Sequence, residues 1–130
     1  MPTSSDPTDM FAGLVDTLRR LEAGEIEPAE PRHAATVVML RDASGGPEVY
    51  LLRRSASMAF AAGAFVFPGG SMDPRDMDLG DEAWVGRPAA EWANDLSCDE
   101  RLARALVCAA VRETFEESGV LLAGTDSTTV

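Results

Sequence analysis

Lysine is missing from this sequence of 130 residues, in which all 11 basic residues are arginine. Mechanisms that need a catalytic lysine or the lysine of a phosphate-binding P-loop are therefore excluded. Histidine occurs once, as His33, and cysteine only as Cys98 and Cys108, without the spacing of a zinc site. Two free thiols are typical of a reducing compartment, so we expect a cytoplasmic protein.

Long apolar runs are also missing, because no stretch approaches the roughly 20 residues of a membrane span. The polar N-terminus lacks the basic region of a signal peptide. A net charge of −11 argues against non-specific binding to nucleic acid or to an anionic membrane. It leaves phosphate substrates open, because a bound metal ion reverses the local charge.

The first 31 residues read as a tail, an amphipathic helix and a linker. Asp6 and Pro7 are typical of a helix start, and Gly24 is typical of a stop. Pro28 and Pro31 indicate the linker. The apolar residues of this helix recur at helical spacing, namely Met10, Phe11, Leu14, Val15, Leu18 and Leu21. We expect this stripe to pack on the domain or on a partner subunit.

Residues 32–130 begin with three stretches that predict strands. Residues 34–40 and 48–53 flank a glycine-containing turn, so they predict a hairpin. A loop of small residues follows, and then the short apolar stretch 65–67. The residues Gly69 and Gly70 come next, and they let the backbone approach a ligand closely or simply form a turn.

A predicted helix near the C-terminus carries most of the chemistry. It starts at Asp99, Glu100 or Arg101 and ends at Ser118, before Gly119. Glu113, Glu116 and Glu117 share one face at helical spacing, where their like charges repel one another. A divalent cation such as Mg²⁺ would remove this repulsion. The alternative is an ordinary solvated acidic helix end.

Two motifs resemble those of a known family. The run Arg112-Glu113-Thr114-Phe115-Glu116-Glu117-Ser118-Gly119-Val120 resembles the Nudix box of Nudix hydrolases, with threonine at the first apolar position. In that family a strand ending in Phe-Pro-Gly-Gly precedes the box, as Phe67-Pro68-Gly69-Gly70 does here. The resemblance extends over residues 34–122.

The resemblance implies an α/β fold, an α/β/α sandwich with a mixed sheet. It also implies Mg²⁺ or Mn²⁺ and hydrolysis of a nucleoside diphosphate linked to another group. Glu116 and Glu117 would be metal ligands, and Glu113 a third ligand or the general base. Arg112 would orient the carboxylates, and a carbonyl of Gly69 or Gly70 would complete the metal's ligands.

The box is interrupted by an acidic insertion over residues 71–100. Asp76 stands where the family has a glutamate, and it either serves as the distant carboxylate or caps a turn. Trp84 and Trp92 favour a folded flap. The interrupted box resembles a branch that includes coenzyme A diphosphatases, so coenzyme A or acyl-coenzyme A is the favoured substrate.

Little sequence follows the box, since residues 124–130 form a polar tail. Family members continue with further strands and a helix. We therefore expect 32–130 to be a partial Nudix domain, truncated after the helix, with a completing C-terminal half or a second copy as partner. The alternative function is a truncated non-catalytic remnant, or a binding or assembly module.

Overall fold

The computed structural model describes residues 7–57, 62–80 and 84–126. The chain divides into two compact units, Met1–Pro31 and Arg32–Val130. The first unit contains helix α1, Pro7–Glu22, with Leu14 and Leu18 exposed. The expected cap at Asp6 and the side chains of Met10 and Phe11 lie outside the described part of the chain.

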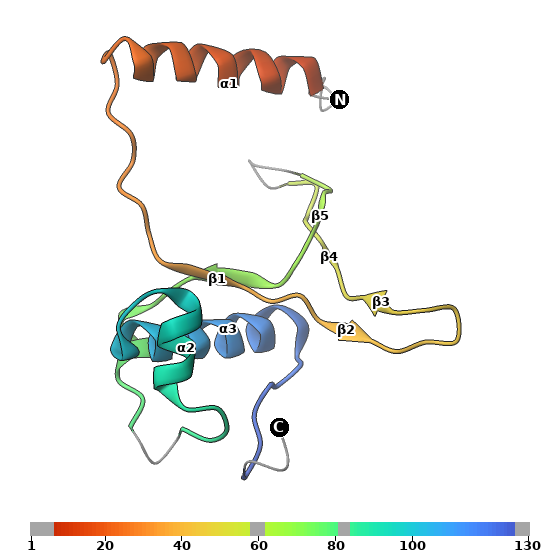
Figure 1. The fold of residues 1–130 in the computed structure, drawn as a ribbon. Helices are drawn as coiled ribbons and strands as arrows, with labels where there is room; N and C mark the ends of the chain where they lie inside the picture. Colours follow the sequence, from red (N-terminus) through yellow and green to blue (C-terminus); the bar gives the residue numbers. More distant parts are fainter. Residues whose placement is uncertain (1–6, 58–61, 81–83, 127–130) are drawn as a thin grey trace. The chain divides into compact units, whose positions relative to one another are not determined.

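Within the described residues, the second unit contains six short strands (Figure 1). They form three two-stranded antiparallel ladders, β1–β6, β2–β3 and β4–β5. The unit combines strands with the helices that follow them, which confirms the α/β class. The strands are β1 (Ala34–Thr36), β2 (Leu40–Arg41), β3 (Glu48–Val49), β4 (Leu52–Arg53), β5 (Phe65–Val66) and β6 (Gly69–Ser71).

The strand predicted over 34–40 is divided because the chain changes partner within it. The Val37 N–H donates to the Pro68 carbonyl at 2.9 Å, so this part follows β6. Two residues later the Met39 carbonyl accepts from the Tyr50 N–H at 3.0 Å, so the next part follows β3. The predicted hairpin is therefore limited to β2 and β3.

One interpretation of the sequence was that Gly69 and Gly70 form a turn, and the structure shows that they do not. They lie in β6, where Gly69 is opposite Thr36 and Gly70 opposite Ala35. Gly69 has a φ of +155°, which favours glycine. A Cβ at Gly69 would also collide with the Ala35 carbonyl oxygen. Glycine is needed at position 69 because the backbone of Ala35 and Thr36 occupies the place of a side chain.

The insertion is folded over the residues that the structure describes, as its tryptophans predicted. It contains the 3₁₀ turn η1, Pro74–Met77, and helix α2, Ala89–Leu96, which packs on helix α3, Glu100–Ser118 (Figure 1). Both predicted ends of α3 are confirmed. The Asp99 carboxylate accepts from the Leu102 N–H at its start, and Gly119 takes a left-handed conformation at its end.

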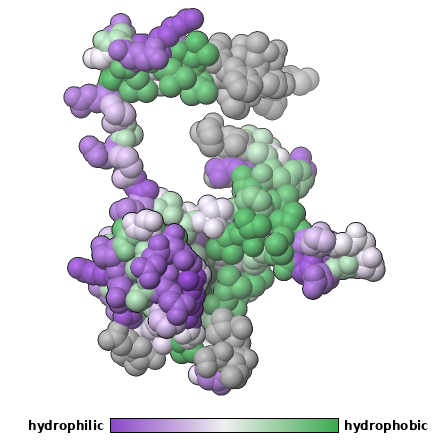
Figure 2. Space-filling view, in the orientation of Figure 1, coloured by the Kyte–Doolittle hydropathy of each residue, from purple (hydrophilic) through white to green (hydrophobic). Residues whose placement is uncertain are grey.

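The core of the second unit is built from small side chains. Among the described residues, the buried hydrophobic ones are Ala93, Ala103, Ala105 and Ala109. Large apolar side chains lie on the strands and after α3, and many of them remain exposed, including Leu40, Phe65 and Leu121. Figure 2 shows a broad hydrophobic area on the visible face of this unit.

Candidate functional site

The candidate site lies where α3 crosses β6. Helix α3 contacts β1, β6 and η1, and its alanines let it approach the strands closely. Gly69 and Gly70 are the first two residues of β6. They lie beside the C-terminal half of α3, where Glu117 and Glu113 reach them. The fold therefore brings together two motifs that are more than 40 residues apart in the sequence.

The Glu113 carboxyl group lies directly over Gly70. A Cβ at Gly70 would come within 2.5 Å of the Glu113 Cδ and Oε2 atoms and 2.6 Å of its Oε1. These distances are well below van der Waals contact. The missing side chain of Gly70 therefore creates the space that the Glu113 carboxylate occupies.

The Glu117 carboxylate reaches the neighbouring glycine, because its Oε2 accepts from the Gly69 N–H at 2.9 Å. Glu116 lies further out, with 56% of its side chain exposed and its Oε2 3.5 Å from Arg112 Nη1. Two of the three predicted carboxylates thus meet at β6, and the third stands at the rim beside Arg112.

Arg112 holds this arrangement together. Its Nε and Nη2 atoms donate to the two Asp76 oxygens at 2.9 and 2.8 Å. Its Nη1 donates to Glu113 Oε1 at 2.8 Å, and its Nη2 also donates to the Ser71 carbonyl at 3.1 Å. One guanidinium therefore fixes η1, the end of β6 and the carboxylate over Gly70.

Asp76 is only 7% exposed and combines structural roles. One of its oxygens accepts from the Asp73 N–H at 2.7 Å, which closes a capping box at the start of η1. Hydrogen bonds from Arg112 lower the pKa of Asp76. Of the two interpretations of Asp76, turn capping is what the geometry shows, together with an ion pair to the half-buried Arg112.

Two partners of this network are absent from the sequence prediction, Asp73 and the carbonyl of Ser71. The spacing Asp-Pro-x-Asp over residues 73–76 could have indicated the capping box. The Arg75 guanidinium donates a bidentate hydrogen bond to the Asp73 carboxylate, which lowers the Asp73 pKa to about 2. No sequence signal indicates the Ser71 carbonyl, because any residue supplies one.

Thr114, on the opposite side of α3 from solvent, is fully buried. In the family's box this position is apolar. The burial of Thr114 explains why an apolar residue suits the position. The Thr114 Oγ1 atom has no hydrogen-bond partner.

His33 and the cysteines lie outside this network. The His33 side chain is exposed, and its backbone carbonyl accepts from the Met72 N–H. Cys98 and Cys108 are free thiols, and burial raises the pKa of Cys108.

The donor set suits a hard divalent cation, because carboxylate and carbonyl oxygens are the ligands that Mg²⁺ and Mn²⁺ prefer. The space over Gly70, which a Cβ would fill, also suits a charged group held close to the backbone. Over residues 7–57, 62–80 and 84–126, however, no three His, Cys, Asp or Glu side chains are grouped closely enough to hold a metal. Glu113 and Glu117 are instead engaged by Arg112 and Gly69.

The β1–β6 register distinguishes the two candidate carbonyls. Bonds from Val37 to Pro68 and from Met72 to His33 flank the ladder, so Ala35 and Gly70 form a hydrogen-bonded pair. The polar backbone atoms of Gly69 consequently face away from β1, on the side of Glu117. The Gly69 carbonyl is the one available to a ligand.

No helix in the described ranges is long and apolar enough to span a membrane. A scan of protein-family models found no match, and a search of curated proteins found no similar sequence. A search of solved structures found similarity to a crystal structure of a NUDIX hydrolase from Alicyclobacillus acidocaldarius. The identity is 34% and the TM-score 0.62, over 80% of this chain. The match spans 45% of that relative's chain, less than half of its length.

Proposed function

We propose that this chain carries the catalytic glutamates of a Nudix hydrolase that cleaves nucleoside-diphosphate-linked substrates. The observation that supports it most directly is the placement of Glu113 and Glu117 against Gly70 and Gly69, in the two motifs that resemble the family. The similarity to the Alicyclobacillus hydrolase points the same way, with identity high enough to argue for more than a shared fold.

In this proposal the protein's own residues position charge. Arg112 keeps the Glu113 carboxylate over Gly70, where it can accept a proton from an attacking water or bind a metal ion. Glu116, Glu117 and the Gly69 carbonyl supply further oxygen ligands. A bound Mg²⁺ or Mn²⁺ would neutralise the diphosphate and lower the pKa of a coordinated water.

Positioning and charge neutralisation account for most of the catalysis of phosphoryl transfer. The local acidity of this site makes the metal essential, because three glutamates without a cation would repel a diphosphate. Asp76 acts behind Arg112 and is a positioning residue. Coenzyme A or acyl-coenzyme A is the favoured substrate through the interrupted box, and the cytoplasm is the favoured location.

The test measures Mn²⁺ affinity by calorimetry and hydrolysis of coenzyme A by product analysis, both on this chain. Glu113→Gln, Glu116→Gln and Glu117→Gln should each weaken Mn²⁺ binding or hydrolysis, by about a hundredfold at the most important position. Glu100→Gln is the matched control, because it removes an exposed carboxylate at the other end of the same helix. Unchanged binding and hydrolysis in all three variants would remove the assignment.

A second candidate, a non-catalytic binding module, is favoured by one observation. Glu113 and Glu117 are already engaged by protein donors, and no group of metal-binding side chains is formed within the described ranges. This candidate predicts weak Mn²⁺ binding without turnover. Robust Mn²⁺-dependent hydrolysis by the chain would exclude it.

A further inference from the structure

We propose that Arg75 binds a phosphate oxygen of the substrate at the rim of the glutamate site. The group that it would recognise is a diphosphate, the anion common to the proposed substrates. This inference rests on the proposed function. It adds a binding residue from the insertion, outside the two motifs that resemble the family.

The site presents mostly negative charge to a substrate. Glu113, Glu116 and Glu117 lie on α3, in a chain whose net charge is −11. A diphosphate is an anion as well, so a cationic side chain near the metal would strengthen its binding. The arginine side chains at the site are therefore the candidates for this role.

Arg112 does not fill this role, because its donors are used within the protein. Its Nε donates to Asp76, and its Nη2 donates to Asp76 and to the Ser71 carbonyl. Its Nη1 donates to Glu113 at 2.8 Å and to Glu116 at 3.5 Å. These bonds account for every N–H of the guanidinium. A phosphate bound to Arg112 would have to displace one of these partners.

Arg75 is fixed in position and still has unused donors. Its Nε and Nη2 donate to the two Asp73 oxygens at 2.9 and 3.0 Å, and 80% of its side chain is exposed. Within residues 7–57, 62–80 and 84–126, its Nη1 has no hydrogen-bond partner. A guanidinium held on one side by a bidentate bond is preorganised to bind a phosphate with its remaining N–H groups.

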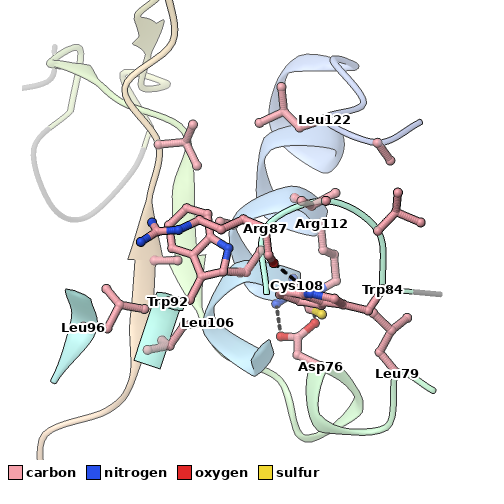
Figure 3. Close-up of a pocket in the computed structure, with 18 of the residues that line it drawn as sticks. Asp76, Leu79, Trp84, Arg87, Trp92, Leu96, Leu106, Cys108, Arg112 and Leu122 are labelled. Carbon is pink, nitrogen blue, oxygen red and sulfur yellow. Dashed lines mark hydrogen bonds and ion pairs between the residues drawn. The ribbon is translucent and has the colours of Figure 1, made fainter. Parts of the chain in front are cut away.

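Arg75 also lies next to the network that holds the glutamates. It precedes Asp76 in η1, and Figure 3 shows Asp76 bonded to Arg112 on the wall of a cavity that Arg75 also lines. The Asp73 carboxylate raises the pKa of Arg75 through its hydrogen bonds, and the charge of Glu116 raises it further. Glu116 and Arg75 are thus close enough to interact, which brings a phosphate bound beside Glu116 within reach of Arg75.

Arg87 lines the same cavity but is less suited to an anion. It forms ion pairs with both Glu91 and Asp95, and it lies over the Trp92 ring at 4.7 Å. Two carboxylates already more than balance its charge, so an added phosphate would be repelled there. Arg75 faces a single carboxylate.

The alternative is that Arg75 and Asp73 form only a surface ion pair. Exposed pairs of this kind contribute little to stability, so replacing Arg75 should leave the fold intact. The start of η1 should also persist, because Asp73 still accepts from the backbone N–H at position 75. Denaturant unfolding should therefore give the same midpoint for the original chain and for Arg75→Gln.

The test measures binding of ADP, as the nucleoside-diphosphate probe, by calorimetry in the presence of Mg²⁺. Arg75→Gln should weaken ADP binding by about tenfold, the effect of losing a charge-assisted hydrogen bond. Arg75→Lys keeps the charge without the planar fork, so its loss should be smaller, about threefold. Arg41→Gln is the matched control, because Arg41 is also 80% exposed and also contacts a carboxylate, Glu48, through its Nε and Nη2. This control should bind ADP as the original chain does.

Three results would overturn the inference. They are an unchanged ADP affinity in Arg75→Gln, an equal loss in Arg41→Gln, and the absence of ADP binding by the original chain. Failure of the proposed function would appear differently. The glutamate variants would then keep their Mn²⁺ affinity and hydrolysis, while ADP binding would still depend on Arg75.

Discussion

Adding one methyl group at Gly70 should separate the function of the site from the stability of the fold. Gly70→Ala places a Cβ where the Glu113 carboxyl group now lies, 2.5 Å from its Cδ. Gly70 has no positive φ, so alanine fits its backbone conformation. The obstacle is the far end of a flexible side chain, which can move.

The size of the effect follows from these distances. Atoms that meet at 2.5 Å must separate to roughly 3.5 Å, so the carboxylate moves by about 1 Å. A displacement of this size at a reacting centre costs about a hundredfold in rate. The free energy of unfolding should change by less than about 1 kcal/mol, because the lower entropy of the unfolded alanine chain offsets the displaced contact.

The assay compares Gly70→Ala with Gly69→Ala. At Gly69 the added Cβ meets the backbone of Ala35 and Thr36, and φ is +155°, so this variant should lose about 2 kcal/mol of stability. Denaturant unfolding and the rate of Mn²⁺-dependent coenzyme A hydrolysis are measured for both. If Gly70→Ala hydrolyses coenzyme A as fast as the original chain, the position of Glu113 over Gly70 has no functional role and the reasoning fails.

Two further variants test the network and the helix. Asp76→Asn leaves the half-buried guanidinium of Arg112 without its buried carboxylate partner and should lose about 2–3 kcal/mol at neutral pH. The Asp76 pKa is lowered in the folded state, so its contribution is complete above its unfolded value near 3.8 and disappears as the pH falls through the lowered value. Unfolding curves from pH 7 to 2 should therefore converge for the two proteins, and a constant difference would contradict this. Thr114→Val removes a buried hydroxyl that has no partner and should gain about 1 kcal/mol in the same assay, whereas a loss would show that the hydroxyl is paired.

Local signals made α3 predictable from the sequence. Asp99 caps it, Gly119 ends it and the glutamate spacing places its functional face, all within one stretch of chain. The meeting of α3 and β6 was expected only because two separate motifs, in the same order, resemble those of a known family. The network around Asp76 was only half predictable, because a capping box is local but its bond to Arg112 spans 36 residues.

The strands show where sequence reasoning fails. Residues 34–40 have the composition of one strand, yet their partner changes at Val38, since the Val37 N–H donates to the Pro68 carbonyl and the Met39 carbonyl accepts from the Tyr50 N–H. Gly69 and Gly70 were open to interpretation as a turn, since glycine is typical of turns. In the structure, glycine is selected by the close approach of Ala35 and Glu113, which only the folded chain reveals.

Crystals of the chain soaked in Mn²⁺ provide the most direct test of the central claim, that the glutamates of α3 and the glycines of β6 form a metal site. The proposal predicts an anomalous difference peak bound by oxygens of Glu113 or Glu117 beside Gly69. A well-ordered map in which both carboxylates keep their bonds to Arg112 and Gly69, with no peak next to them, would contradict it.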